Sequence, residues 1–536
     1  MQPSCCTLAA QVAIADLVSG RGARQTAPMQ LRTIALALGL AVATAGCQQA
    51  DKPGEVAQAR EIAWREGDVD DALAEARELG KPVILYWGAV WCPPCNQMKA
   101  SLFKDPAFIA ETEKFVPVYL DGDTEGAQRW GETFGISGYP TVIVLSPDGT
   151  EVTRISSATI ASELPELLRV AGGRTTSVEA LLAKAEENTA SLGTDDWRLL
   201  AGFDWRNDPK HFSDLAKAGT LLDRLAQVAP EPALRRRFAL LALVVAVGKD
   251  DAGKTVLTPA QRARVGAVLT PILADRGEIL ANRQELTYDA AGLVSALPAS
   301  PERERLAVAL VAAGDAIYAD ESLSMTERVE ALNIDVALTA EDGKVPSAVL
   351  AKVRERAAWA DRTAKDKITR QSVIDDAAYL LFDAGDHAGA KTLLTAELDR
   401  SDQPYYYMSS LSDFAEREGD KAAAVEWARK AYQASQGPAT RVQWAILWSN
   451  AVLRLTPEDD AAVARAAGAV IDELGESPDS YYQRTRVKVA AWGDKLREWS
   501  AANGGGAVLE RLRTRMAGVC EQQGAQAATC REWSRA

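Results

Sequence analysis

The stretch that decides the fold covers residues 83–95 and reads Val83-Ile84-Leu85-Tyr86-Trp87-Gly88-Ala89-Val90-Trp91-Cys92-Pro93-Pro94-Cys95. It opens with a continuous apolar run over residues 83–87, which predicts a buried strand. The Cys-Pro-Pro-Cys motif follows at once and opens a segment of helical pattern that continues towards Phe103. We therefore predict that Cys92 lies at the corner where a buried strand passes into a helix.

A helix N-terminus is a favourable position for a reactive cysteine. The positive end of the helix dipole and the unpaired backbone N–H groups stabilise a thiolate there, and the thiolate is the attacking species. A second thiol on the same turn can then resolve the mixed disulfide. This spacing predicts Cys92 as the nucleophile and Cys95 as the resolving residue. Their redox-active disulfide would be the only redox group, and we expect no further cofactor.

A Cys-x-x-Cys pair can also be half of a zinc site, or a structural disulfide. A zinc site needs two further Cys or His ligands, and none lies nearby in the sequence. The whole chain has two histidines, His211 and His387, which exclude a multi-histidine metal centre. The tryptophan and the buried strand before the motif fit a redox role better. We predict a redox pair and no metal site.

Strand and helix patterns alternate on both sides of this corner. Besides the first strand, we expect strands over 115–120, 141–146 and 151–155, the last two joined by a Pro-Asp-Gly turn. Helices are expected over 69–79, from Pro106, over 125–134 and over 162–170. The order β-α-β-α-β-β-α, with the cysteine pair at the first strand-to-helix corner, predicts a redox domain over residues 61–172.

Further motifs in this segment support a family resemblance. They are Gly80-Lys81-Pro82-Val83, Trp91-Cys92-Pro93-Pro94-Cys95, Met98, Phe103-Lys104-Asp105-Pro106-Ala107-Phe108, Phe115-Val116-Pro117-Val118 and Gly138-Tyr139-Pro140-Thr141. As a set they resemble the thioredoxin superfamily, and most closely the C-terminal periplasmic domain of DsbD-type thiol:disulfide interchange proteins. The resemblance covers about a fifth of the chain.

The resemblance implies roles for residues around the cysteine pair. It implies that the Tyr139–Pro140 bond is cis and lies against the pair, with Pro140 as part of the catalytic site because it offers no competing N–H. It also implies that Trp91, Gly138 and Tyr139 contact an extended substrate segment. One position departs from the family: where many thioredoxins have a buried Asp, six residues before the first cysteine, this chain has Tyr86. A phenol is a poor base at neutral pH.

Beyond residue 172, helical periodicity replaces the alternating pattern. Gly385-Asp386 and its flanking residues recur as Gly419-Asp420, an offset of 34 residues that is the period of tetratricopeptide repeats (TPR). The strongest pair of units covers 372–405 and 406–439. The fold class we predict is therefore an α/β thioredoxin-like domain followed by a large all-α, TPR-like helical-repeat domain over 173–536. Such a domain suggests a docking surface for partners, although an irregular helical bundle is the alternative.

The first sixty residues indicate export. Residues 1–46 are predicted to be leader and signal peptide, with Met29 as the true start, followed by a tether over 47–60. Ala43-Thr44-Ala45-Gly46-Cys47 resembles a bacterial lipoprotein box, which would place a lipid on Cys47. By the lipoprotein sorting pattern, Gln48 favours the outer over the inner membrane. Cleavage after Ala45 would instead release a soluble periplasmic protein.

Composition and the remaining cysteines narrow the function further. The formal net charge of −14, without long basic runs, disfavours nucleic acid as a partner. Cys520 and Cys530 lie near the C-terminal end of the sequence, and in an oxidising compartment they are candidates for a structural disulfide. A role as relay partner of Cys92 is the alternative.

These observations predict a periplasmic, lipid-anchored thiol:disulfide oxidoreductase that acts on protein dithiols and disulfides through Cys92 and Cys95. Reduction is favoured because the resemblance is to electron-donating domains. A reductase outside the cytoplasm then needs a membrane electron donor of DsbD type. The alternative is a TPR-type adaptor of the cell envelope that uses the thioredoxin fold mainly for binding.

Overall fold

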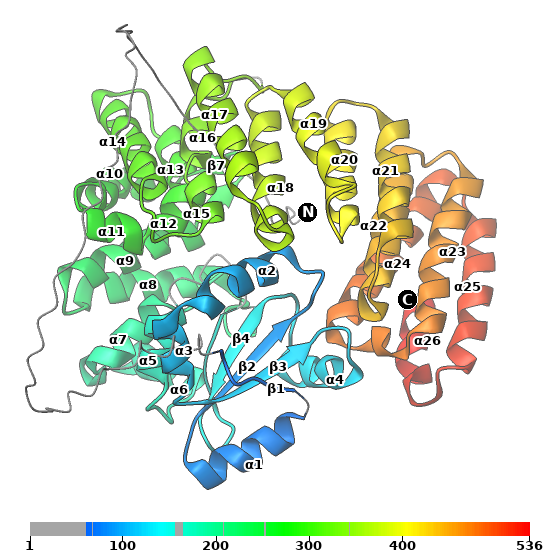
Figure 1. Ribbon diagram of the computed structural model, residues 1–536, viewed down its shortest axis with the longest axis horizontal. Helices are drawn as coiled ribbons and strands as arrows, with labels where there is room; N and C mark the ends of the chain where they lie inside the picture. The colour runs from blue at the N-terminus through cyan, green and yellow to red at the C-terminus, as the bar shows by residue number, and fades with distance from the viewer. Residues whose placement is uncertain are drawn as a thin grey trace, which may run out of the picture.

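The computed structural model describes residues 61–535, apart from residues 67, 156–163, 207, 209, 251–252 and 342. The expected signal peptide, the start at Met29, the lipidation site Cys47 and the tether over 47–60 lie outside the described residues. Figure 1 displays an α/β domain enclosed on one side by a long succession of helices, which bends around it as an arc.

The α/β domain is built on a five-stranded sheet with the order β1-β3-β2-β4-β5. The strands are β1 (Arg65–Glu66), β2 (Val83–Gly88), β3 (Val116–Asp121), β4 (Thr141–Leu145) and β5 (Glu151–Ile155). Strands β1, β3 and β2 are parallel, whereas β4 and β5 run antiparallel to their neighbours. The four strands expected from the sequence are present, and every residue of central β2 is buried.

The described part of this domain contains five α-helices: α1 (Val69–Leu79), α2 (Pro93–Ala100), α3 (Pro106–Thr112), α4 (Glu125–Phe134) and α5 (Leu164–Ala171). The expected helix towards Phe103 ends earlier, at Ala100, and continues as the short 3-10 helix η1 (Leu102–Lys104). Asp105 caps α3, since its carboxylate accepts from the backbone N–H groups of Ala107 and Phe108.

Alternate residues of β2 enter two different cores. Val83, Leu85 and Trp87 pack with residues of α1 and α4. Ile84 and Tyr86 face α2, α3 and α5, and this second core continues without interruption into α6 (Val178–Glu187), α7 (Thr194–Ala201), α8 (Leu215–Val228) and α9 (Pro232–Val245). The first helices after the sheet are therefore joined to it by a shared hydrophobic core.

The remaining elements are almost all helical. They are η3 (Thr189–Ser191), β6 (Gly248–Lys249), β7 (Thr255–Val256), α10 (Pro259–Leu273), α11 (Arg276–Ala281), α12 (Arg283–Glu285), the π-helical turn η4 (Leu286–Ala290), α13 (Ala291–Ser295), α14 (Pro301–Tyr318), α15 (Met325–Glu330), α16 (Asn333–Thr339), α17 (Ser347–Thr363), α18 (Lys367–Asp383), α19 (His387–Glu397), α20 (Pro404–Arg417), α21 (Lys421–Ala434), α22 (Pro438–Leu455), α23 (Asp460–Glu476), η5 (Pro478–Tyr481), α24 (Gln483–Asn503), α25 (Gly506–Glu521), η6 (Gly524–Gln526) and α26 (Ala527–Arg535). None of the helices in the described part of the chain combines the length and apolarity needed to cross a bilayer.

The repeated Gly-Asp dipeptides form turns between paired helices. Gly385 and Gly419 both have positive φ, and the aspartate that follows each glycine caps the next helix, α19 or α21. Ala390 and Ala424, at equivalent places in those helices, are fully buried. The turn chemistry and the close helix approach are as the sequence indicates, while the assignment of these pairs to the TPR class stays a prediction.

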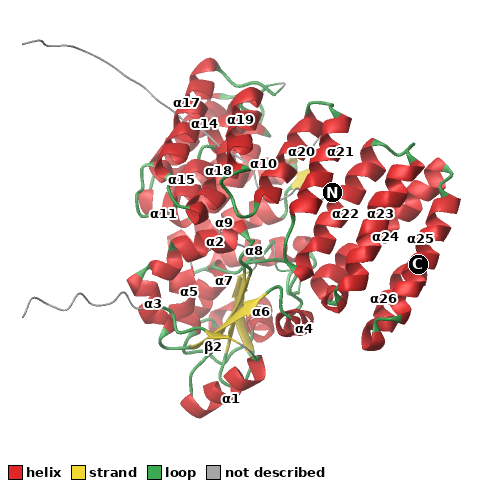
Figure 2. Cartoon of the chain, turned by 45° about the vertical axis from the view of Figure 1, so that its right-hand side comes forward, coloured by secondary structure: helices red, strands yellow, loops and turns green. Residues whose placement is uncertain are grey.

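The later helices curve back over the α/β domain. Helix α18 packs against α2, and α24 packs against α4, although these partners are far apart in the sequence. Figures 1 and 2 both place the α/β domain on the inner side of the arc, with α2 at the boundary between the two. The N-terminus of α2, which carries the cysteine pair, thus faces the helical region.

Candidate functional site

Cys92 and Cys95 form a disulfide at the start of α2. Cys92 is the N-cap residue, and its Sγ accepts a hydrogen bond from the backbone N–H of Cys95 at 3.2 Å. Pro93 and Pro94 occupy the first two helical positions and have no N–H, so the Cys95 amide is the first one able to point at this sulfur. In the reduced protein the same amide and the helix dipole would stabilise a thiolate at Cys92.

A cis peptide bond lies beside this helix N-terminus. The bond joins Tyr139 to Pro140, as the family resemblance implies. Thr141 follows as the first residue of β4 and pairs with Trp87 near the end of β2, the strand from which the chain runs to Cys92. The sheet therefore brings the cis bond and the cysteine pair to the same edge.

The other residues expected to contact substrate gather at this edge too. The rings of Trp91 and Tyr139 lie 5.8 Å apart, and the Trp91 indole N–H donates to the Asp123 carboxylate at 2.6 Å. The carbonyl of Gly138 accepts from the hydroxyl of Thr141 at 2.9 Å. Two aromatic faces thus flank the disulfide, and Asp123, which no sequence pattern places beside the cysteine pair, holds one of them.

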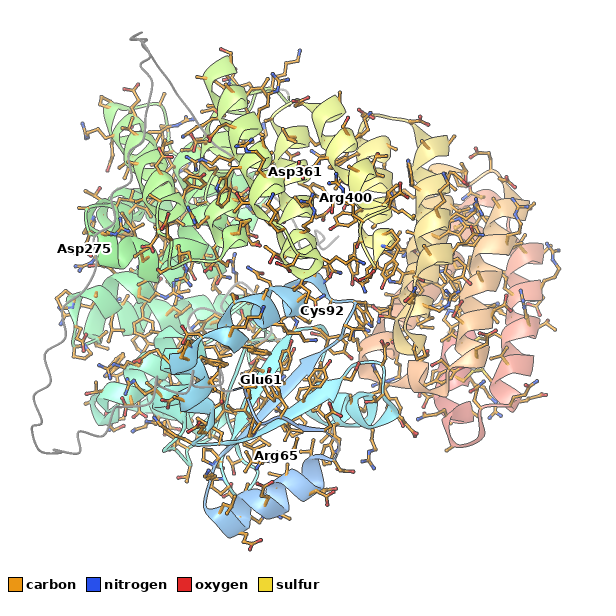
Figure 3. The ribbon with its side chains drawn as sticks, viewed as in Figure 1. Glu61, Arg65, Cys92, Asp275, Asp361 and Arg400 are labelled. Atoms are coloured by element: carbon orange, nitrogen blue, oxygen red, sulfur yellow. A yellow bond between two sulfur atoms is a disulfide. The ribbon has the colours of Figure 1, made fainter. Side chains whose placement is uncertain are left out.

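The cysteine pair is covered by the helical region. Cys92 is 3% exposed and Cys95 0%, and both belong to a hydrophobic cluster with Tyr405, Ala431 and Trp444 of helices α20–α22. In Figure 3 Cys92 lies where the α/β domain meets the inner side of the arc. The aromatic run at Tyr405 is a visible signal in the sequence, but nothing local indicates that it packs on the redox pair.

Two polar residues of the helical region also reach the site. Gln371 of α18 accepts from the Asn96 side chain at 2.7 Å, and its own amide lies 3.5 Å from the Trp91 carbonyl. The Arg484 guanidinium of α24 stacks over the rings of Trp91 and Tyr139, at 5.3 and 4.5 Å from their centroids. Neither residue could be placed here from the sequence.

Tyr86 of β2 lies in the core that the sheet shares with helices α2, α3 and α5–α9. Its hydroxyl is buried without a hydrogen-bond partner among the described residues, and burial raises the pKa of Tyr86 above its ordinary value of 10. The hydroxyl is therefore protonated throughout the neutral range. Tyr86 cannot serve as the base that removes a proton from Cys95.

We expect Tyr86→Phe to leave disulfide-reductase turnover and its pH profile between pH 6 and 9 unchanged. The substitution removes a buried hydroxyl for which the described part of the chain offers no hydrogen-bond partner, so stability should be retained or rise by up to about 1 kcal/mol. Insulin reduction across this pH range and urea denaturation measure both effects. A turnover loss of tenfold or more would assign Tyr86 a role in proton transfer.

The second cysteine pair lies elsewhere. Cys520 and Cys530 form a disulfide and are buried in a cluster shared by helices α22–α26. Cys92 and Cys95 belong to a different cluster, so the two disulfides do not share a core. Within the described residues, no group of three or more His, Cys, Asp or Glu side chains is arranged to hold a metal ion.

Comparison with known proteins locates the similarity in the α/β domain. A family model described as a thioredoxin-like domain matches residues 69–172. The Thiol:disulfide interchange protein DsbD 1 of Pseudomonas aeruginosa is 34% identical over 110 residues, which are 20% of this chain and 19% of that protein. The chain thus spans about a fifth of that relative's length.

Two smaller proteins match the same domain. A Thioredoxin H-type protein of rice (Oryza sativa subsp. indica) is 29% identical over 92 residues, or 17% of this chain and 70% of that protein. A thioredoxin from Thermus thermophilus, solved in solution, is 29% identical and covers 20% of this chain and 86% of its own, with a TM-score of 0.19. The family match, and not this structural likeness, shows that the chain contains a thioredoxin-like domain. The structure shows a cysteine pair in that domain and a large helical region after it.

Proposed function

We propose that this protein is a thiol:disulfide oxidoreductase that acts on protein disulfides through Cys92 and Cys95. The observation that carries the proposal is the disulfide at the N-terminus of α2, where Cys92 is the N-cap residue and its sulfur accepts from the Cys95 amide. The named activity of the Pseudomonas relative, thiol:disulfide interchange, supports the same chemistry.

In the direction we favour, the reduced protein transfers two electrons to its client. The Cys92 thiolate attacks one sulfur of the client disulfide, forms a mixed disulfide and releases the other client sulfur as a thiolate. The Cys95 thiolate then attacks the Cys92 sulfur, which breaks the mixed disulfide and releases the second client thiolate. The client ends as a dithiol and this protein as the Cys92–Cys95 disulfide, which an external dithiol must reduce again.

We further propose that this reaction takes place in the periplasm, on a protein anchored by a lipid at Cys47. The lipoprotein-like box before Cys47 supports the anchor, and Gln48 supports the outer membrane. The dithiol that restores the reduced state would then come from a membrane electron donor of DsbD type. Fractionation of cells into soluble periplasm and membranes distinguishes this anchored form from the soluble alternative.

Trapping the mixed disulfide tests the proposed reaction directly. We expect Cys95→Ala to accumulate covalent complexes with client proteins, because the resolving thiol is absent and the Cys92–client bond persists. Non-reducing electrophoresis, followed by mass spectrometry of the complexes, detects the trapped species and identifies the client. The double variant Cys92→Ser/Cys95→Ala is the matched control. If Cys95→Ala and this control give identical patterns, the proposed exchange does not occur.

A TPR-type adaptor is the second candidate. One observation favours it, the near-complete burial of Cys92, because a covered cysteine suits a domain that binds rather than reacts. The insulin-reduction assay separates the two candidates. An adaptor would not accelerate insulin reduction by dithiothreitol, and neither would adaptor variants in which a substitution exposes Cys92.

A further inference from the structure

The surface that covers the redox pair belongs to the same chain. Tyr405, Ala431 and Trp444 share one buried hydrophobic cluster with the two cysteines, and they belong to helices α20–α22 of the arc. Attack on a disulfide requires the incoming sulfur to reach the thiolate, so exchange depends on access. With Cys92 3% exposed, a protein client cannot reach its sulfur in this arrangement.

We propose that the inner face of helices α18–α24 is a docking surface for the chain's own thioredoxin-like domain. While it is in place it excludes protein clients from Cys92, and catalysis requires it to move away. We call this covering surface the cap. The inference rests on the proposed function, because covering Cys92 regulates the protein only if Cys92 reacts with other proteins. The helical region was expected to dock partner proteins, and in the closed arrangement the redox domain itself occupies this surface.

The helical region takes the positions that a client segment would need. A client in extended conformation would lie along the sheet edge at Tyr139 and Trp91. The Arg484 guanidinium already lies over both rings, 4.5 Å from the centroid of Tyr139 and 5.3 Å from the centroid of Trp91. Gln371 occupies the space beside the Trp91 carbonyl and bonds Asn96. The cap thus blocks the substrate-facing rings as well as the sulfur.

The two attachments of the α/β domain differ in kind. On the side of α5–α9 the sheet and the helices share one hydrophobic core, which would have to be broken to separate them. On the side of the Cys92–Cys95 disulfide, the α/β domain contacts the helical region through the aromatic cluster and through separate polar pairs. Asn96 bonds Gln371, and Gln97 bonds Ser324 at 3.1 Å. Glu132 and Arg486 form an exposed ion pair. The attachment at α5–α9 therefore stays in place, and the attachment around the cysteine pair is the one able to open.

Unsatisfied polar groups weaken the closed arrangement. The Nε and Nη1 atoms of Arg484 are buried without hydrogen-bond partners among the described residues, and so is the Tyr405 hydroxyl. Such groups regain hydrogen bonds with water when the surface is exposed, so they lower the free energy needed for opening. Successive hydrophobic clusters along the arc each join neighbouring helices, which allows the later helices to swing while the attachment at α5–α9 stays in place.

The rate at which iodoacetamide alkylates reduced Cys92 tests the cap in the full-length chain. Fragmentation of the peptide that holds Cys92 and Cys95 in tandem mass spectrometry assigns the label to one cysteine or the other. We expect Gln371→Ala to speed Cys92 alkylation about tenfold, because the substitution removes a buried hydrogen bond that Asn96 makes only in the closed state. The Asn96 amide keeps its other bond, to the Val90 carbonyl at 3.0 Å. The proposal is overturned if wild-type Cys92 is alkylated as fast as a cysteine in an unstructured peptide.

An ion pair between the α/β domain and the helical region provides a second test, in which reversing both charges is the control. Arg486 of α24 pairs with Glu132 of α4 at 2.7 Å. Glu132→Arg places like charges together and should speed alkylation about threefold, whereas Glu132→Arg/Arg486→Glu should restore the wild-type rate. Glu416→Arg, which breaks an exposed pair with Arg454 inside the helical region, is the matched control and should leave the rate unchanged. If Glu132→Arg and Glu416→Arg behave alike, the junction between the α/β domain and the helical region does not control access to Cys92.

Insulin reduction by the same variants separates this inference from the proposed function. If the variants speed alkylation but leave insulin unreduced, the cap exists and the oxidoreductase proposal fails. If wild-type Cys92 alkylates at the open rate and insulin is reduced, the cap fails and the oxidoreductase proposal holds. If both proposals hold, the variants that open the site raise both rates together.

Discussion

Replacing Cys92 with serine is expected to lower insulin reduction by on the order of 10³-fold or more, to the rate of dithiothreitol alone. The hydroxyl of serine has nearly the same size as the thiol, so the start of α2 should keep its structure. It is not ionised at neutral pH and cannot form a disulfide, however, so neither the first attack nor the mixed disulfide is possible. Insulin turbidity measured with and without protein gives this ratio.

A loss of that size must come from chemistry and not from misfolding. Circular dichroism and the thermal midpoint of Cys92→Ser, compared with those of reduced wild type, provide the control. The comparison uses reduced protein because oxidised wild type carries the additional Cys92–Cys95 link. Substantial residual turnover in a folded Cys92→Ser protein would mean that another group attacks the client.

Much of the α/β domain could be predicted because its determinants are local. The apolar run over 83–87 is buried on both faces and forms the central strand, and Asp105-Pro106 begins a helix. The exception is β1, whose two residues are too few to show a period of two. Arg65 is assigned to a strand only because it pairs with Val118 of β3, a contact between segments distant in the sequence.

The redox pair could also be predicted from local sequence, whereas the helices that cover it could not. Cys92, Cys95 and the residues between them define their own geometry at one helix start. The cover depends on contacts such as that between Asn96 and Gln371, which are separated by 275 residues. Gln371 is a polar residue buried in α18, a helix with apolar residues on several sides. Helical periodicity assigns a polar residue to the solvent face, so the contact leaves no trace in the local pattern.

The C-terminal disulfide has the second large expected effect. Cys520 lies at the end of α25 and Cys530 in α26, and both are buried against the helices that close the arc. A cross-link over ten residues removes conformational freedom from the unfolded segment, an effect of about 2.7 kcal/mol in the loop-entropy treatment. Because these helices belong to a hydrophobic cluster that is separate from the core around the sheet, the effect should be local.

We therefore expect Cys520→Ala/Cys530→Ala to raise the amide hydrogen-exchange rates in α25 and α26 by about 100-fold, as 2.7 kcal/mol implies. Exchange in α8 and α9, which belong to a different core, serves as the internal control and should be unchanged. The same variant decides between the structural and relay roles of this pair. A relay would make insulin reduction by the variant fall to the level of Cys92→Ser, whereas a structural link leaves turnover at the cysteine pair of α2 intact. Unchanged exchange in α25 and α26 would contradict the structural role, because the link would then contribute nothing to the stability of the helices it joins.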